Sequence, residues 1–62
     1  MKKFIALTEY DNGIKVVFNT DYIVKAEKED NYKTLIKYNY GQSGYFIYVK
    51  EPLDEILEIL NS

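Results

Sequence analysis

The spacing of apolar residues changes abruptly at one proline near the end of this 62-residue chain. Before Pro52, apolar residues alternate with polar ones, or run together, in five short stretches. Beyond it they recur at helical spacing, at Leu53, Ile56, Leu57 and Leu60. Proline fits the first turn of a helix and cannot donate a hydrogen bond to a strand ladder. We therefore predict an α+β fold, in which a small antiparallel sheet of about five strands precedes one C-terminal helix.

Turn-forming segments divide the strand region. Asn12-Gly13 is the clearest of them, because both residues tolerate the positive φ values that tight hairpins require. The predicted strands cover about 3–10, 14–18, 22–28, 32–40 and 45–50, and the helix about 52–60, within a single domain of residues 1–62. The sheet is expected to be a meander, with an SH3-like barrel as the curled alternative. The first and last strands are apolar on both alternating faces, which predicts central positions covered from both sides.

The predicted helix carries acids in its first turn, at Asp54 and Glu55, where the macrodipole stabilises negative charge. We expect the apolar stripe named above to be buried and Ile59 to lie off it. On that basis Leu57→Ala should lower the free energy of unfolding by about 2–5 kcal/mol.

We expect the sheet to need more cover than one helix can supply. A domain of this size buries only about 60% of the surface of its unfolded chain. The sequence contains neither Cys nor His, so the usual disulfide or metal staples are missing. A helix of about ten residues spans roughly 15 Å and covers part of one sheet face. We therefore expect either barrel closure or a homo-oligomer. The candidate interaction surface is Tyr38, Tyr40, Tyr45, Tyr48, Glu55, Glu58 and Ile59.

The residue types present do not favour catalysis. Without His or Cys the chain lacks the commonest general base and the thiol nucleophile. Asp11-Asn12-Gly13 lacks the further oxygens of a calcium loop, and residues 41–44 lack the Lys-Ser/Thr ending of a phosphate loop. We expect a protein that is not an enzyme, with no cofactor, no catalytic residue and no metal ligand. A metal-dependent hydrolase built on the acidic residues is the weakest alternative.

Charge is unevenly distributed along the chain. Residues 1–50 hold eight Lys against six acids, whereas residues 51–62 hold four acids and no base. This balance argues against a general nucleic-acid binder. The apolar patch after Met1-Lys2-Lys3 is too short for a signal peptide, and no run of apolar residues is long enough to span a membrane, so we expect a cytoplasmic protein. All basic residues are Lys, and Ile, Asn and Tyr are frequent, which indicates an AT-rich genome of a bacterium or its phage.

The order of these features resembles that of the FlbD-like (SwrD-like) family of small bacterial flagellar and swarming-motility proteins. The segments that carry the resemblance are Phe4-Ile5-Ala6-Leu7-Thr8, Gly13, Val17-Phe18-Asn19, Asp21-Tyr22-Ile23, Thr34-Leu35-Ile36, Tyr48-Val49-Lys50-Glu51 and Asp54-Glu55-Ile56. The chain departs from the pattern in its lysine- and tyrosine-rich fourth strand and in Pro52. The resemblance implies an accessory protein that acts through contacts and has no catalytic residues.

Three functions follow as hypotheses. The first is a protein-interaction or oligomerisation module that contacts itself or another protein. The second is a phage-type decoy or inhibitor, which either blocks a host protein or sequesters a nucleotide signal by stacking its base on tyrosines and binding its phosphate with lysines. The third is a small barrel that binds nucleic acid through its interleaved tyrosines and lysines.

Overall fold

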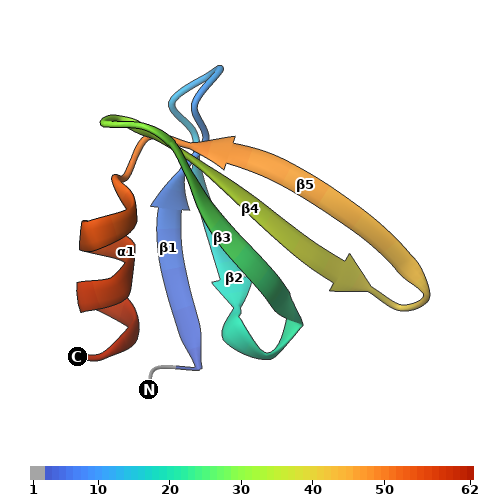
Figure 1. The fold of residues 1–62 in the computed structure, drawn as a ribbon. Coiled ribbons are helices and arrows are strands. Elements are labelled where there is room, and N and C mark those ends of the chain that lie inside the picture. The colour runs from blue at the N-terminus through green and yellow to red at the C-terminus, as the bar shows by residue number, and fades with distance from the viewer. Residues whose placement is uncertain (1–2) are drawn as a thin grey trace.

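The computed structural model describes residues 3–62, so the start of the N-terminal segment, Met1-Lys2, lies outside the described residues. Its strands are β1 (Phe4–Thr8), β2 (Lys15–Asn19), β3 (Ile23–Asp30), β4 (Lys33–Tyr40) and β5 (Ser43–Val49). A short 3-10 helix η1 (Thr20–Tyr22) connects β2 to β3, and the helix α1 (Leu53–Leu60) follows β5 (Figure 1). The predicted α+β class is confirmed, with five antiparallel strands and one C-terminal helix.

The strands form two sheets, where we had expected one: β1 pairs with β2, and β3, β4 and β5 form a meander. The sheets meet where β1 and β5 end, through the isolated bridge between Glu9 and Val49. Two backbone hydrogen bonds of 2.9 Å flank this bridge, from Lys50 N–H to the Thr8 carbonyl and from Tyr10 N–H to the Tyr48 carbonyl. We call this contact the β1–β5 junction. Elsewhere the sheets diverge (Figure 1), so the described strands do not close into a barrel.

Local sequence explains the two connections of β2. At the predicted hairpin, Gly13 has a φ of 72°, and the Asn12 side chain accepts a hydrogen bond of 2.9 Å from Ile14 N–H. At the other end, the Asn19 side chain accepts a hydrogen bond of 2.9 Å from Asp21 N–H and so caps η1. Because η1 turns the chain out of the strand direction, β2 and β3 are neighbours in sequence without sharing a ladder.

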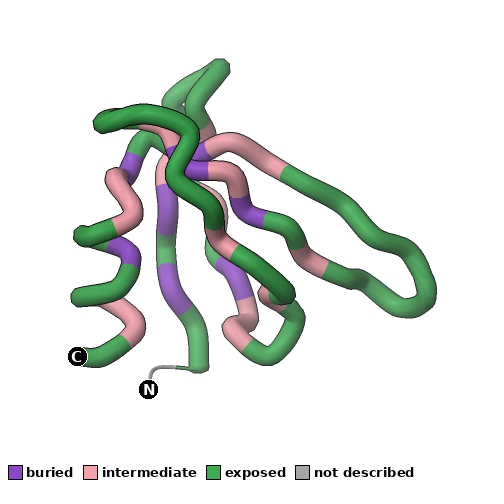
Figure 2. Tube along the Cα trace, viewed as in Figure 1, coloured by how far each residue is buried: buried purple, intermediate pink, exposed green. Residues whose placement is uncertain are grey.

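The core lies between the two sheets and is closed by α1. Its buried apolar residues are Ile5, Leu7, Phe18, Ile36, Val49 and Ile56. Figure 2 shows the buried positions running from the β1–β5 junction down between β1, β2 and α1, with exposure rising toward the tip of the β4–β5 hairpin. The double cover predicted for the first and last strands is wrong, since Phe4 is 57% exposed and Phe46 is 65% exposed. One helix and two diverging sheets enclose only the inner face of each strand.

The helix presents a different face to the core from the one predicted. Ile56 is fully buried, and Ile59 and Leu60 pack against the core, whereas Leu57 is 50% exposed. Successive helical residues are about 100° apart, so a face centred on Ile56 includes Ile59, about 60° away, and leaves Leu57 at its margin. The expected burial of Leu57 is therefore wrong, and the large cost expected for its truncation loses its basis.

A buried acid fastens the junction between the sheets. Glu51 is 8% exposed, and its two carboxylate oxygens accept hydrogen bonds from Thr8 N–H at 2.8 Å and from the Thr8 hydroxyl at 2.7 Å. The Glu51 carbonyl accepts a further hydrogen bond of 2.7 Å from the buried Thr34 hydroxyl, and Lys15 Nζ lies 3.9 Å from the carboxylate. One residue thus links β1, β4 and the segment that leads into the helix.

The helix packing predicts unequal effects of two adjacent truncations. Ile56→Ala should lower the free energy of unfolding by about 2–5 kcal/mol, because it empties a closed site, whereas Leu57→Ala should cost less than about 1 kcal/mol. Urea unfolding followed by circular dichroism measures both values. Equal losses in the two variants would contradict the orientation of the helix.

The Glu51 contacts predict a graded response to substitution. Glu51→Ala should cost about 1–3 kcal/mol, because it leaves Thr8 N–H without a buried partner. Glu51→Gln should cost less, since the amide oxygen accepts from Thr8 N–H and the amide nitrogen donates to the hydroxyl oxygen. Glu58→Ala, on the exposed side of the helix, is the control and should change stability little. The same unfolding measurement ranks the three, and any other order contradicts the assigned role.

Candidate functional site

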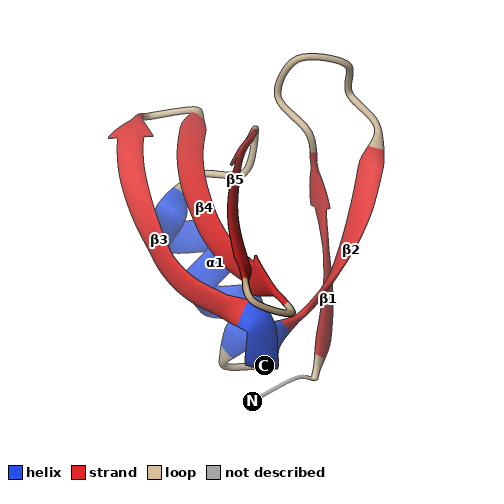
Figure 3. Cartoon of the chain, turned by 90° about the vertical axis from the view of Figure 1, so that its right-hand side faces the viewer, coloured by secondary structure: helices blue, strands red, loops and turns tan. Residues whose placement is uncertain are grey.

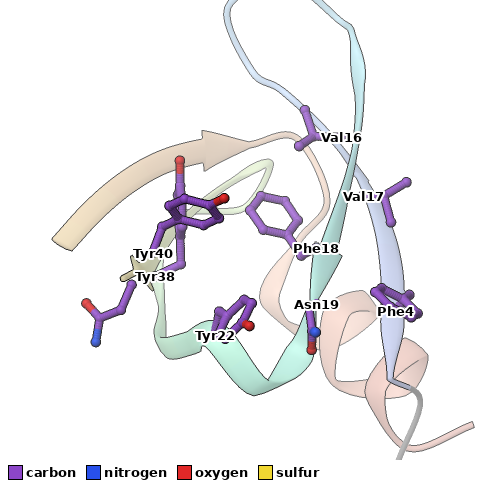
Figure 4. A pocket seen from close by; sticks show the side chains of 9 residues that line it. Phe4, Val16, Val17, Phe18, Asn19, Tyr22, Tyr38 and Tyr40 are labelled. Atoms are coloured by element: carbon purple, nitrogen blue, oxygen red, sulfur yellow. The ribbon is translucent and has the colours of Figure 1, made fainter. Parts of the chain in front are cut away.

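The divergence of the two sheets leaves an apolar cleft of about 420 Å³. Its walls come from the first residue of β1, from β2, from η1 and from the end of β4 (Figure 4). The lining residues are Phe4, Val16, Val17, Phe18, Asn19, Tyr22, Tyr38, Asn39 and Tyr40. We call this site the aromatic cleft.

The alternation of β4 determines where the cleft begins. Thr34 and Ile36 are fully buried, Tyr38 is half-buried, and Tyr40 is 71% exposed, although all four belong to the same face of the strand. Burial therefore falls along β4 as the strand leaves the core. The aromatic cleft is the continuation of the core into the space where the sheets have separated.

Ring contacts fix the inner wall of the aromatic cleft. Tyr38 meets Phe18 edge to face, with ring centroids 5.6 Å apart and planes at 72°. It also stacks on Tyr45, its cross-strand partner, at 5.6 Å and 24°. Such pairs contribute about 0.5–1.5 kcal/mol each beyond their buried area. Tyr38 is therefore held on both sides, whereas the rings of Tyr22 and Tyr40 stand exposed at the rim (Figure 4).

The aromatic cleft carries no formal charge. None of its nine lining residues is Lys, Asp or Glu. Its polar groups are tyrosine hydroxyls and the side-chain amides of Asn19 and Asn39, and the Asn19 oxygen already accepts the hydrogen bond from Asp21 N–H. The chemistry available here is apolar and aromatic contact with a few neutral hydrogen bonds.

The seven residues of the predicted interaction surface fall in three places. Tyr38, Tyr40 and Tyr45 share the inner face of the β3–β4–β5 sheet, the first two in the lining of the cleft. Tyr48 lies on the outer face, because it is three residues from Tyr45 along the same strand. Glu55 and Glu58 are exposed on α1, and Ile59 packs against the core. The structure thus brings together only the first three.

The outer face of the sheet has its own aromatic group. Tyr48 meets Phe46 edge to face at 6.0 Å. Lys33 Nζ lies 4.5 Å from the centroid of the Tyr48 ring and 4.6 Å from that of Tyr10, in cation–π contact with both rings. Since Tyr10 follows β1, this lysine connects the two sheets on the side away from the core.

Sequence reasoning missed several residues of the aromatic cleft. Phe4, Val17 and Tyr22 were assigned to strands or turns and not to a site. The available signal was the second apolar face of the first strand, which we interpreted as evidence of a central position. The structure shows that this face of β1 stays open, with Phe4 57% exposed, and the neighbouring Val17 of β2 is 67% exposed.

One pKa on β3 departs clearly from its usual value. Lys25 Nζ lies 2.8 Å from a Glu27 carboxylate oxygen, and this hydrogen bond, with the charge of Lys25 and a smaller effect of Lys37, lowers the pKa of Glu27. Folding therefore favours the ionised acid, so the contribution is present above the unfolded pKa and is lost as pH falls through the lowered one. The pair is about half exposed and lies outside the aromatic cleft.

Within residues 3–62, no group of three or more His, Cys, Asp or Glu is placed to hold a metal ion. No helix of the described chain is long and apolar enough to cross a membrane. Comparisons with protein-family models, with curated proteins and with solved structures found no match to this chain.

The ring contacts predict different effects for two neighbouring cleft tyrosines. Tyr38→Ala should lower the free energy of unfolding by about 2 kcal/mol or more, because it removes two ring pairs and opens the core. Tyr40→Ala should change it by less than about 0.5 kcal/mol, since that ring is mostly in solvent. Thermal and urea unfolding test this pair, and a costly Tyr40→Ala would show that the rim is part of the core.

Proposed function

We propose that this protein is a non-enzymatic interaction module of bacterial or phage origin, which binds a protein surface in the cytoplasm through the aromatic cleft. The observation that carries the proposal is an uncharged site whose inner wall is fixed by ring contacts and whose rim is exposed. Exposed rings next to a rigid apolar surface are typical of the anchor regions of protein interfaces. An accessory role of this kind agrees with the resemblance to the FlbD-like family.

The amount of exposed apolar surface supports a macromolecular partner. Phe4, Tyr22 and Tyr40 are 57%, 53% and 71% exposed. Taking about 200 Å² for each ring side chain, they present roughly 350 Å², to which Val17 adds. A standard interface buries about 800 Å² on each partner, somewhat more than half of it apolar. The rim therefore supplies most of the apolar area that one side of such an interface needs.

The same site offers little to a nucleotide. Tyrosine rings could stack on a base, but a phosphate needs a cation or a cluster of N–H donors. No lysine is among the lining residues of the aromatic cleft; Lys3 Nζ lies 6.0 Å from the centroid of the Phe4 ring, and Lys33 is engaged with two rings on the outer face. These placements favour a protein partner over the nucleotide decoy.

Substitution at the rim tests this proposal. Tyr40→Lys should weaken complex formation at least about tenfold, because binding would bury an unpaired ammonium group. Phe46→Lys is the matched control, since Phe46 is 65% exposed but belongs to the outer face of the sheet. Native mass spectrometry of the protein purified gently from its host reports both self-association and bound proteins. Equal effects of the two variants, or no complex of either kind, would contradict the proposal.

A further inference from the structure

One edge of β2 is open along the aromatic cleft. Hydrogen bonds of 2.8 Å from Glu9 N–H to the Ile14 carbonyl and from Thr20 N–H to the Lys3 carbonyl define the alternation of the β1–β2 ladder. By that alternation the backbone groups of Val16 and Phe18 face β1, and those of Lys15, Val17 and Asn19 face away from it. Within the described chain no strand pairs with this outer edge (Figure 3).

The two outer strands differ in how they are protected against pairing. The bridge between the sheets gives the order β2-β1-β5-β4-β3, so that β2 and β3 are outermost. In β3 the register shifts twice, and its sequence IVKAEKED is rich in charge. In β2 the register is regular, and Lys15 is the only charged residue of KVVFN. Bulges and charges are the usual devices that keep an edge from pairing, and β2 lacks most of them.

We infer that a second copy of this chain docks on the free edge of β2. The two β2 strands pair antiparallel about a two-fold axis at Val17, which gives a continuous sheet of β1, β2 and the same two strands of the second copy. This inference rests on the proposed function and names its partner. Centring the pair on Val17 overlaps all five residues of each strand, and Val17 exchanges two backbone hydrogen bonds with Val17 of the second copy.

Charge complementarity supports the antiparallel direction. Lys15 begins β2 and its side chain is 70% exposed, while Asp21 lies exposed just beyond the other end of the strand. Antiparallel pairing brings Lys15 of each copy toward Asp21 of the other. Parallel pairing would instead align the two Lys15 side chains, and like charges that face each other across a sheet are unfavourable.

The area available also fits a dimer. Val17 is 67% exposed and would lie against its counterpart, Phe4 belongs to the same face of the β1–β2 sheet, and Tyr40 lies on the other side of β2 (Figure 4). The rings of Phe4 and Tyr40 together expose roughly 250 Å² on each copy, about half of the apolar part of one side of a standard interface. Six buried apolar residues form the core described above, so a second copy supplies cover that the single chain lacks.

Two valine substitutions of similar exposure test the inference. Val17→Lys places two ammonium groups opposite each other on the axis and should raise the dimer dissociation constant at least about tenfold. Val24→Lys, at a position that is 64% exposed on β3, should leave the constant unchanged. Sedimentation equilibrium over a concentration series gives both constants, and circular dichroism verifies that each variant is folded.

A cross-linking measurement keeps the test independent of the effect of added charge. The chain contains no Cys, so Val17→Cys introduces a single thiol on the axis. A short bismaleimide should join two copies of Val17→Cys at a protein concentration where Val24→Cys remains uncoupled. Cross-linking of both variants, or of neither, would overturn the β2–β2 pairing.

The outcomes also separate this inference from the proposed function. A dimer that Val17→Lys weakens and Val24→Lys spares supports the inference. A wild-type protein that stays monomeric throughout the series overturns it, and if that monomer retains a foreign protein that Tyr40→Lys releases, the proposed function stands with a different partner. A dimer that survives Val17→Lys unchanged overturns the role of β2.

Discussion

The fold depends on the junction at which β1 and β5 end. One isolated bridge with its two backbone hydrogen bonds, together with the buried Glu51 carboxylate, holds two otherwise separate sheets together there. The carboxylate accepts both Thr8 hydrogen bonds. The buried acid and the Thr8 N–H group therefore each have a hydrogen-bond partner. Away from this junction β4 and β5 become progressively more exposed, whereas β1 and β2 keep Ile5 and Phe18 buried toward their other ends. The aromatic cleft is thus a direct result of fastening two sheets at one end only.

Features that depend on neighbouring residues could be predicted from the sequence. The hairpin at Asn12-Gly13 follows from local backbone preference, and the helix after Pro52 follows from a change of period, and both occur in the structure. The alternation of the fourth strand likewise identified the residues of its inner face. Two tyrosines of the predicted interaction surface, Tyr38 and Tyr40, belong to that face and line the aromatic cleft.

Features that depend on distant residues could not be predicted in the same way. Glu51 lies 43 residues from its partner Thr8, so no local pattern marks it as buried. Around the helix, Ile56 has Ile59 on one side and Leu57 on the other, so the sequence allows two possible buried faces. Only packing against the sheets determines that Ile59 contacts the core and Leu57 is half exposed. The separation of the sheets is also non-local, and for this reason the open apolar faces of β1 and β5 were mistaken for covered ones.

The way the two sheets are joined has a mechanical consequence. The ladders β1–β2 and β3–β4–β5 each keep their hydrogen bonds internal, and none of them crosses the aromatic cleft. A rotation of one sheet relative to the other would break no ladder, but it would disturb the Phe18–Tyr38 ring contact, the connection at η1 and the ring contacts of Lys33. The angle between the two sheets is therefore determined by the β1–β5 junction and by side-chain contacts, and not by backbone hydrogen bonds across the aromatic cleft.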